Sequence, residues 1–243
     1  MAEPNAALPL FFREIVPLEP RVHGELRLER GRDYRFARES NAIPIALHES
    51  AAAAGDYPIV FGGPGQPTML AIVGYREREN LFVDLAGSWR AGTYIPAYVR
   101  NYPFAFIEAP DGKTLVLGFD PQARCFGKSG APVFVNAQPA PPLTEAAELC
   151  KQLYQSLRET GAFVAALEAN GLLIENSAVI DFKQGGQAVL RGFRVVDAEK
   201  FNALDDAVFL DWRKRGWLPA LYAHFLSAAR WSRIVDLGAG QRP

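Results

Sequence analysis

The sequence predicts an α+β fold, with a β-rich N-terminal part and a helical C-terminal part that contains a β-hairpin. Short apolar runs broken by glycine and proline fill residues 1–137, whereas residues 143–243 carry leucines at helical spacing around one glycine-linked pair of strands. A proline-rich connector separates the two parts, which we expect to pack as one globular unit. Strands and helices do not alternate regularly, so a doubly wound sheet is disfavoured.

The predicted N-terminal elements are short and punctuated by turns. An alanine run predicts a helix at Ala51–Ala54 that ends at Gly55. The pair Asp111-Gly112 is typical of a hairpin turn between two apolar runs. The predicted strands are Tyr57–Phe61, Thr68–Tyr75, Leu81–Val83, Phe104–Glu108 and Thr114–Phe119.

The C-terminal part is predicted to begin with a long helix. Thr144 can cap its start, Asn170-Gly171 ends it, and Gly161 predicts an interruption. A hairpin joined across Gly185-Gly186 follows, and two further helices come after it. The hairpin strands are Ser177–Phe182 and Gln187–Val196, and the helices are Asp205–Arg215 and Pro219–Arg230.

The composition argues against several classes of protein. The formal net charge of -1 over 243 residues lacks the basic surplus of a nucleic-acid-binding protein. No window reaches the roughly 20 consecutive apolar residues that a membrane span needs. The N-terminus has no basic region ahead of an apolar core, so we expect a cytoplasmic location, with surface association only by a dedicated export route.

Two glycine-containing segments resemble known binding motifs, but each lacks a feature that its motif requires. Gly127-Lys128-Ser129 matches the end of a phosphate-binding loop, but Gln122 stands where that loop needs a glycine. Residues 235–240, VDLGAG, resemble the first motif of class I methyltransferases, yet only three residues follow and no sheet can be built from them. We expect a frayed tail there instead.

The histidines and cysteines show no metal-binding or nucleophile pattern, so we predict no metal and no cofactor. We expect His224 to be held by a hydrogen bond where the last helix packs on the rest of the protein. Cys150 is expected in the core. Cys125 stands beside Arg124, a neighbour that can modestly activate its thiol.

The most unusual segment is Asn80–Phe106, which is rich in aromatic residues and poor in charge. Its tyrosines at 94, 98 and 102 stand four apart, and this spacing forms one stripe on a helix. Pro96 fits only the first turn of such a helix, so Thr93 becomes the candidate cap and Pro103 marks the end.

Two interpretations of this segment are open. In the first it is a short buried helix, with Arg100 paired to an acid such as Asp84. In the second it forms an aromatic-walled pocket in which Arg100 holds an anionic group. Physical reasoning alone favours the buried helix, because aromatic stripes are more often core than site. The candidate ligand-binding residues are Asp84, Trp89, Tyr94, Tyr98, Arg100 and Tyr102, with His48 and His224 as further polar members of a site.

Three motifs in the segment resemble the hallmark block of the SapC family. They are LFVD at 81–84, GxW at 87–89 and YIPAYVRxYPF at 94–104. Weaker matches flank them, at 36–44, 57–61, 190–197 and 222–227, so the resemblance extends from about Leu8 to Ser227. The chain is thus similar to bacterial proteins commonly labelled as S-layer-related.

The resemblance implies a setting rather than a reaction, since neither a reaction nor a cofactor is settled for the family. It implies a link to TonB-dependent receptors or flavin-dependent halogenases, whose genes often lie near those of the family. Our leading hypothesis is a non-catalytic accessory or binding protein of surface-layer or nutrient-uptake systems, which recognises a small molecule, peptide or glycan. The alternatives are a structural S-layer-associated component and an enzyme of unrecognised class that acts on an imported or modified small molecule.

We predict that the native protein fractionates with the cytosol of its bacterium, because the sequence shows no export signal. Immunoblotting of cytosolic, membrane and surface-layer extracts measures this, with a cytosolic enzyme as the marker for leakage. Recovery of most of the protein in ordered surface-layer material would contradict the prediction and favour the structural alternative.

Overall fold

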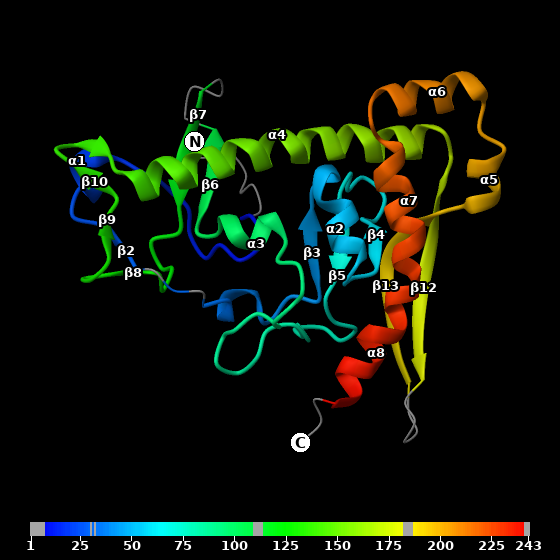
Figure 1. The fold of residues 1–243 in the computed structure, drawn as a ribbon, viewed down its shortest axis with the longest axis horizontal. Coiled ribbons are helices and arrows are strands. Elements are labelled where there is room, and N and C mark those ends of the chain that lie inside the picture. The colour runs from blue at the N-terminus through cyan, green and yellow to red at the C-terminus, as the bar shows by residue number, and fades with distance from the viewer. Residues whose placement is uncertain (1–7, 30, 32, 109–113, 182–186, 241–243) are drawn as a thin grey trace, which may run out of the picture.

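A computed structural model describes residues 8–29, 31, 33–108, 114–181 and 187–240. It shows the predicted α+β fold, drawn in Figure 1 as an elongated molecule with one long helix, α4 (Pro141–Ala169), running along it. The predicted hairpin turns at Asp111-Gly112 and Gly185-Gly186 lie outside the described residues. None of the described helices is long and apolar enough to cross a membrane.

The largest sheet in the described part of the chain has five strands, in the order β12-β13-β4-β5-β3. All its pairings are antiparallel, and β13 joins β4 through the pair Arg194 and Phe61. Strands from both ends of the sequence therefore share one sheet. The bounds are β3 Ala42–Ile45, β4 Ile59–Phe61, β5 Met69–Ile72, β12 Leu173–Asp181 and β13 Gln187–Val196.

Three smaller sheets occupy the other end of the described molecule, beside the start of α4 (Figure 1). Their strand orders are β1-β7-β6, β8-β2-β9 and β10-β11. A second hydrophobic cluster forms there around Phe104 and Phe119. The bounds are β1 Val16–Pro17, β2 Arg27–Leu28, β6 Phe104–Glu108, β7 Leu115–Phe119, β8 Phe126–Gly127, β9 Ala131–Pro132, β10 Phe134–Val135 and β11 Gln138–Pro139.

The remaining helices are short. Helix α2 packs against α7, and both lie over the main core. The α-helices are α1 Pro20–His23, α2 Ser50–Ala54, α3 Ala97–Asn101, α5 Ala198–Asn202, α6 Asp206–Lys214, α7 Leu218–Ser227 and α8 Trp231–Gly240. The 3-10 turns are η1 Arg35–Ala37, η2 Leu47–Glu49 and η3 Ala228–Arg230.

Several local predictions are wrong, each because a tertiary contact overrides a local signal. Helix α4 continues through Gly161, where the residues after it bury their side chains and the glycine has space beside it. The expected frayed tail is helix α8, because Ile234 is fully buried and Gly238 lets the helix approach the ring of Tyr75 closely. Residues 81–83 form a buried turn rather than a strand, with only a bridge from Val83 to Trp89.

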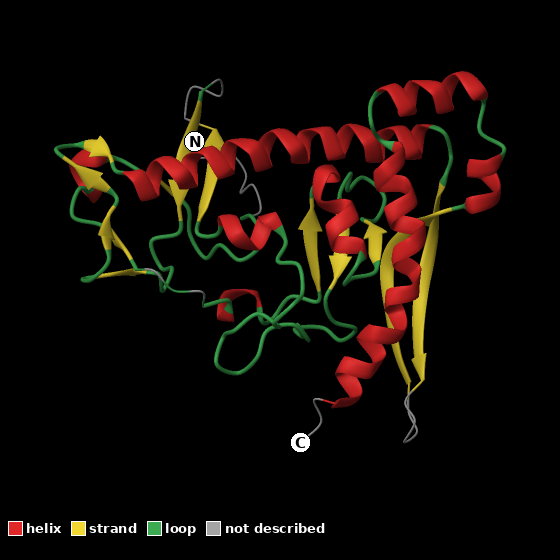
Figure 2. Cartoon of the chain, viewed as in Figure 1, coloured by secondary structure: helices red, strands yellow, loops and turns green. Residues whose placement is uncertain are grey.

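Helix α3 is also shorter than predicted. Pro96 precedes its first residue instead of lying inside its first turn, and Thr93 donates its hydroxyl hydrogen to the Arg90 carbonyl rather than capping the helix. Tyr94 and Tyr102 therefore lie on either side of α3, and Tyr98 alone of the three tyrosines is helical. Figure 2 shows that the chain from β5 to α3 is almost entirely loop.

His224 holds α7 to the sheet, as the sequence predicts. The register of β13 on β4 sets Val196 opposite Ile59, but the strands do not bond each other there. Instead the Val196 N–H donates to Nε2 of His224 over 3.2 Å, and Nδ1 lies 2.7 Å from the Ile59 carbonyl oxygen. Because a backbone N–H can only donate, Nδ1 carries the proton of a neutral imidazole. The imidazole ring therefore bridges β13 and β4 at a position where a backbone hydrogen bond would otherwise join them.

We predict that His224 makes the protein less stable in acid. Burial lowers the pKa of its imidazole to about 4, below the ordinary value of 6.5. The unfolded state therefore binds the proton first, and the free energy of unfolding falls as the pH drops from about 6.5 to about 4, by roughly 3 kcal/mol from this residue. Urea unfolding at several pH values, in the wild type and in His224→Gln, measures the contribution. The two proteins should differ most at neutral pH, and a constant difference would contradict the prediction.

Candidate functional site

The first half of the segment Asn80–Phe106 enters the core at residues 80–83 and at Trp89. Leu81, Phe82 and Val83 are buried, and the buried side chain of Asn80 bonds the Ala37 carbonyl and the Phe82 N–H. Leu81, Phe82 and Val83 therefore serve packing, whereas Leu85 is exposed.

Trp89 lies in the same half of the segment Asn80–Phe106. Its ring is buried and its indole N–H donates to the hydroxyl of Tyr57 over 3.2 Å. That hydroxyl in turn donates to the carbonyl of Tyr94. Asp84 is exposed, and its carboxylate accepts the Ser88 N–H within a turn rather than pairing with Arg100. Both Asp84 and Trp89 lie outside the lining of the cavity described below.

Glu49 organises the second half of the segment. This buried carboxylate accepts the Ala46 N–H with one oxygen, at 2.7 Å. Its other oxygen accepts the Tyr94 hydroxyl at 2.8 Å and the Ala97 N–H at 2.7 Å. Burial and the charge of Glu49 raise the pKa of Tyr94 to about 12, so this phenol stays protonated and donates. Glu49 thereby fixes the loop and the start of α3 together.

Arg100 depends on this arrangement. Its Nε donates to the Ile95 carbonyl over 3.0 Å, and a terminal nitrogen donates to the Tyr94 hydroxyl over 3.2 Å. The guanidinium also lies against the Tyr94 ring, 5.8 Å from its centre. Arg100 is thus held at the surface of α3 by the residues that precede the helix.

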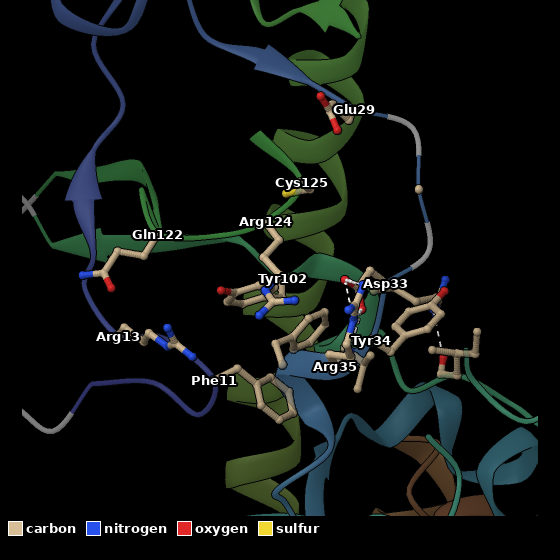
Figure 3. A pocket seen from close by; sticks show the side chains of 15 residues that line it. Phe11, Arg13, Glu29, Asp33, Tyr34, Arg35, Tyr102, Gln122, Arg124 and Cys125 are labelled. Carbon is tan, nitrogen blue, oxygen red and sulfur yellow. Dashed lines mark hydrogen bonds and ion pairs between the residues drawn. The ribbon is translucent and has the colours of Figure 1, made fainter. Parts of the chain in front are cut away.

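A cavity of about 750 Å³ opens beside α3, and Arg100 and Tyr102 line it. Figure 3 shows that its other walls come from distant parts of the chain: the N-terminal segment, the stretch before η1 and the loop between β7 and β8. The aromatic lining residues are Phe11, Tyr34, Phe36 and Tyr102. The charged residues in the described part of the lining are Arg13, Glu29, Asp33, Arg35, Arg100 and Arg124.

The aromatic wall is built around a stacked pair. The ring centres of Phe36 and Tyr102 lie 4.1 Å apart with their planes inclined by 29°, and Phe11 packs edge-on to Phe36 at 5.2 Å between centres. Phe11 adopts a left-handed backbone, φ 79°, which a bulky residue rarely occupies. Its ring also meets Tyr98, whose pKa is raised to about 12 by burial and which lies outside the cavity lining.

Asp120 anchors three residues that line the cavity. This fully buried carboxylate accepts the Tyr102 hydroxyl and the Arg13 N–H, each at 3.0 Å, and its second oxygen accepts the Gln122 N–H at 2.9 Å. Burial and the bond to Asp120 raise the pKa of Tyr102. The phenol is therefore committed to Asp120, while its ring faces the cavity.

The thiol of Cys125 lines the cavity but is not activated. Burial raises its pKa to about 11, so the thiol is protonated at neutral pH, in contrast to the expectation drawn from neighbouring Arg124. Cys150 is buried, as predicted, with its sulfur 3.7 Å from the amide oxygen of Asn101.

The two histidines proposed as polar site members lie apart from the cavity. His48 is exposed, and His224 lies on the buried face of α7. Sequence reasoning missed Arg13, Asp33 and Arg35 because no motif surrounds them. The one available signal was Phe36, which lies in a segment that matches the family pattern.

We predict that replacing Glu49 with glutamine destabilises the protein by about 1–3 kcal/mol, because an amide NH₂ then faces a buried donor. Tyr94→Phe, which removes one donor and keeps the ring, should cost about 1 kcal/mol. Urea unfolding measures both, and Glu77→Gln, at an exposed position, is the matched control. Equal midpoints for Glu49→Gln and Glu77→Gln would refute the role given to Glu49.

Comparison with known proteins identifies the chain at the level of its family. No curated protein and no solved structure shows a significant match to it. The family model described as SapC matches residues 18–234, which include α3, Arg100, Tyr102 and most of the cavity lining. Because this match covers most of the sequence, the chain belongs to the SapC family.

Proposed function

We propose that this protein is a non-catalytic binding protein, which recognises a small molecule, peptide or glycan in the cavity beside α3. The observation that carries the proposal is the lining itself, in which a stacked aromatic pair faces several guanidinium groups. Its volume of about 750 Å³ falls within the usual range of ligand pockets.

The chemistry of the lining supports binding over catalysis. In the described part of the chain the lining holds no histidine or lysine. Its thiol, Cys125, is protonated at neutral pH, and the Tyr102 hydroxyl is bonded to Asp120. Neither group is therefore poised to act as a nucleophile or a general base. Rings and guanidinium groups, in contrast, bind ligands without proton transfer.

The biological setting of this binding activity rests on family membership. We propose an accessory role in a surface-layer or nutrient-uptake system, with a functional link to TonB-dependent receptors or flavin-dependent halogenases. A cytoplasmic protein in this role would hold its ligand after import or before modification.

The proposal is tested by screening aromatic acids, dipeptides and monosaccharides against the protein by ligand-observed NMR. We expect hits from at least one class, which then identifies the type of ligand. Phe36→Ala removes half of the stacked pair, so each hit should bind roughly five- to tenfold more weakly.

Leu226→Ala is the matched control, because this exposed side chain lies on α7 and outside the cavity lining. It should leave the affinity unchanged. Folded Phe36→Ala that binds every hit as tightly as the wild type would show that the cavity is not the site. The absence of any hit, with no ligand retained on purification from the native host, would overturn the proposed function.

A further inference from the structure

The four arginines in the described lining of the cavity differ in how their guanidinium groups are engaged. Arg35 is paired with Asp33, through Nε to Oδ1 at 2.8 Å and a terminal nitrogen to Oδ2 at 2.8 Å. Arg100 is bonded to Ile95 and Tyr94. Both are therefore occupied by the protein itself.

Arg13 and Arg124 are not occupied in this way. Among the described residues, neither guanidinium makes a hydrogen bond or an ion pair, and both residues are exposed. Figure 3 shows the side chains of Arg13 and Arg124 extending toward Tyr102 in the lining of the cavity. The positive charge of Arg13 partly opposes the raised pKa of the Tyr102 phenol, and that of Arg124 helps Arg35 to lower the pKa of Asp33. Both charges therefore reach groups that line the cavity.

The local charge of the cavity is positive. Its described lining carries the four guanidinium groups against two carboxylates, Glu29 and Asp33. Asp33 is already paired with Arg35, and Glu29 accepts the hydroxyl of Ser129 at 2.8 Å. The whole chain has a formal net charge of only -1, so this positive charge is a local concentration rather than a general property of the surface.

We propose that Arg13 and Arg124 form an anion-binding subsite, which takes a carboxylate or phosphate group attached to a flat, apolar body. This inference rests on the proposed binding function and names the class of ligand. Guanidinium groups bind the oxygens of both anions through paired hydrogen bonds. The face of the Phe36–Tyr102 pair accepts the body. Because the Tyr102 hydroxyl is committed to Asp120, the arginines carry the polar recognition.

The test uses three probes of one shape on the full-length protein: benzoate, phenyl phosphate and neutral benzamide. Titration by calorimetry and by amide NMR shifts gives their affinities. We expect both anions to bind more tightly than benzamide and to weaken as sodium chloride is raised. The tighter of the two anions identifies the preferred group.

Arg13→Gln and Arg124→Gln should each weaken the two anions by roughly tenfold and leave benzamide unchanged. Arg213→Gln is the matched control, since it removes one exposed positive charge away from the cavity. It should change none of the affinities. Because Arg13 and Arg124 are exposed, we expect their variants to fold, and thermal melting verifies this.

Three results would overturn the inference. If benzamide binds as tightly as the anions, or if Arg13→Gln and Arg124→Gln bind the anions as tightly as Arg213→Gln does, the cavity does not select for charge. The proposed binding function would survive either result, because it requires only that some ligand depend on Phe36. If wild-type protein binds none of the three probes while the wider screen yields neutral hits, the anion subsite alone is wrong.

Discussion

The buried carboxylate of Glu49 is the interaction on which the arrangement of the site depends. It joins the start of η2, the loop at Tyr94 and the first residue of α3 through three hydrogen bonds. The chain between β5 and α3 has almost no regular structure of its own, so its backbone groups need partners from elsewhere. Without this acceptor, two buried N–H groups and a phenol would be left unsatisfied. The position of Arg100 follows, since it is held by the same loop.

Asp120 plays a similar part on the other side of the cavity. It gathers the N-terminal segment, Tyr102 and the loop after β7 around one buried carboxylate. Among the described residues, the hydrogen-bond partners of Glu49 and Asp120 are backbone N–H and tyrosine O–H donors rather than guanidinium groups. Glu49 and Asp120 therefore hold the residues around the cavity in place without forming ion pairs with its described guanidinium groups.

The parts of the fold that could be predicted from sequence are those governed by local periodicity. Helix α4 and strands β6 and β13 follow from the spacing of apolar residues and from turn residues beside them. The cavity could not be predicted, because its arginines come from segments about a hundred residues apart and no local pattern connects them. The prediction that Tyr94, Tyr98 and Tyr102 share one helix is wrong for a related reason. The regular spacing of these tyrosines is real, but α3 begins only at Ala97, after Pro96, so Tyr94 lies outside the helix.

The motifs that identify the family, within residues 81–104, share few residues with the set that would determine ligand specificity. Leu81, Phe82, Val83 and Trp89 are buried, so packing accounts for their residue types. Tyr102 belongs to both groups, because its hydroxyl fastens the scaffold to Asp120 while its ring forms the cavity wall. Arg13 lies outside the block and fastens the scaffold only through its backbone N–H, which leaves its side chain free to set specificity. A shared scaffold with separately placed arginines can therefore keep one fold while its ligand changes.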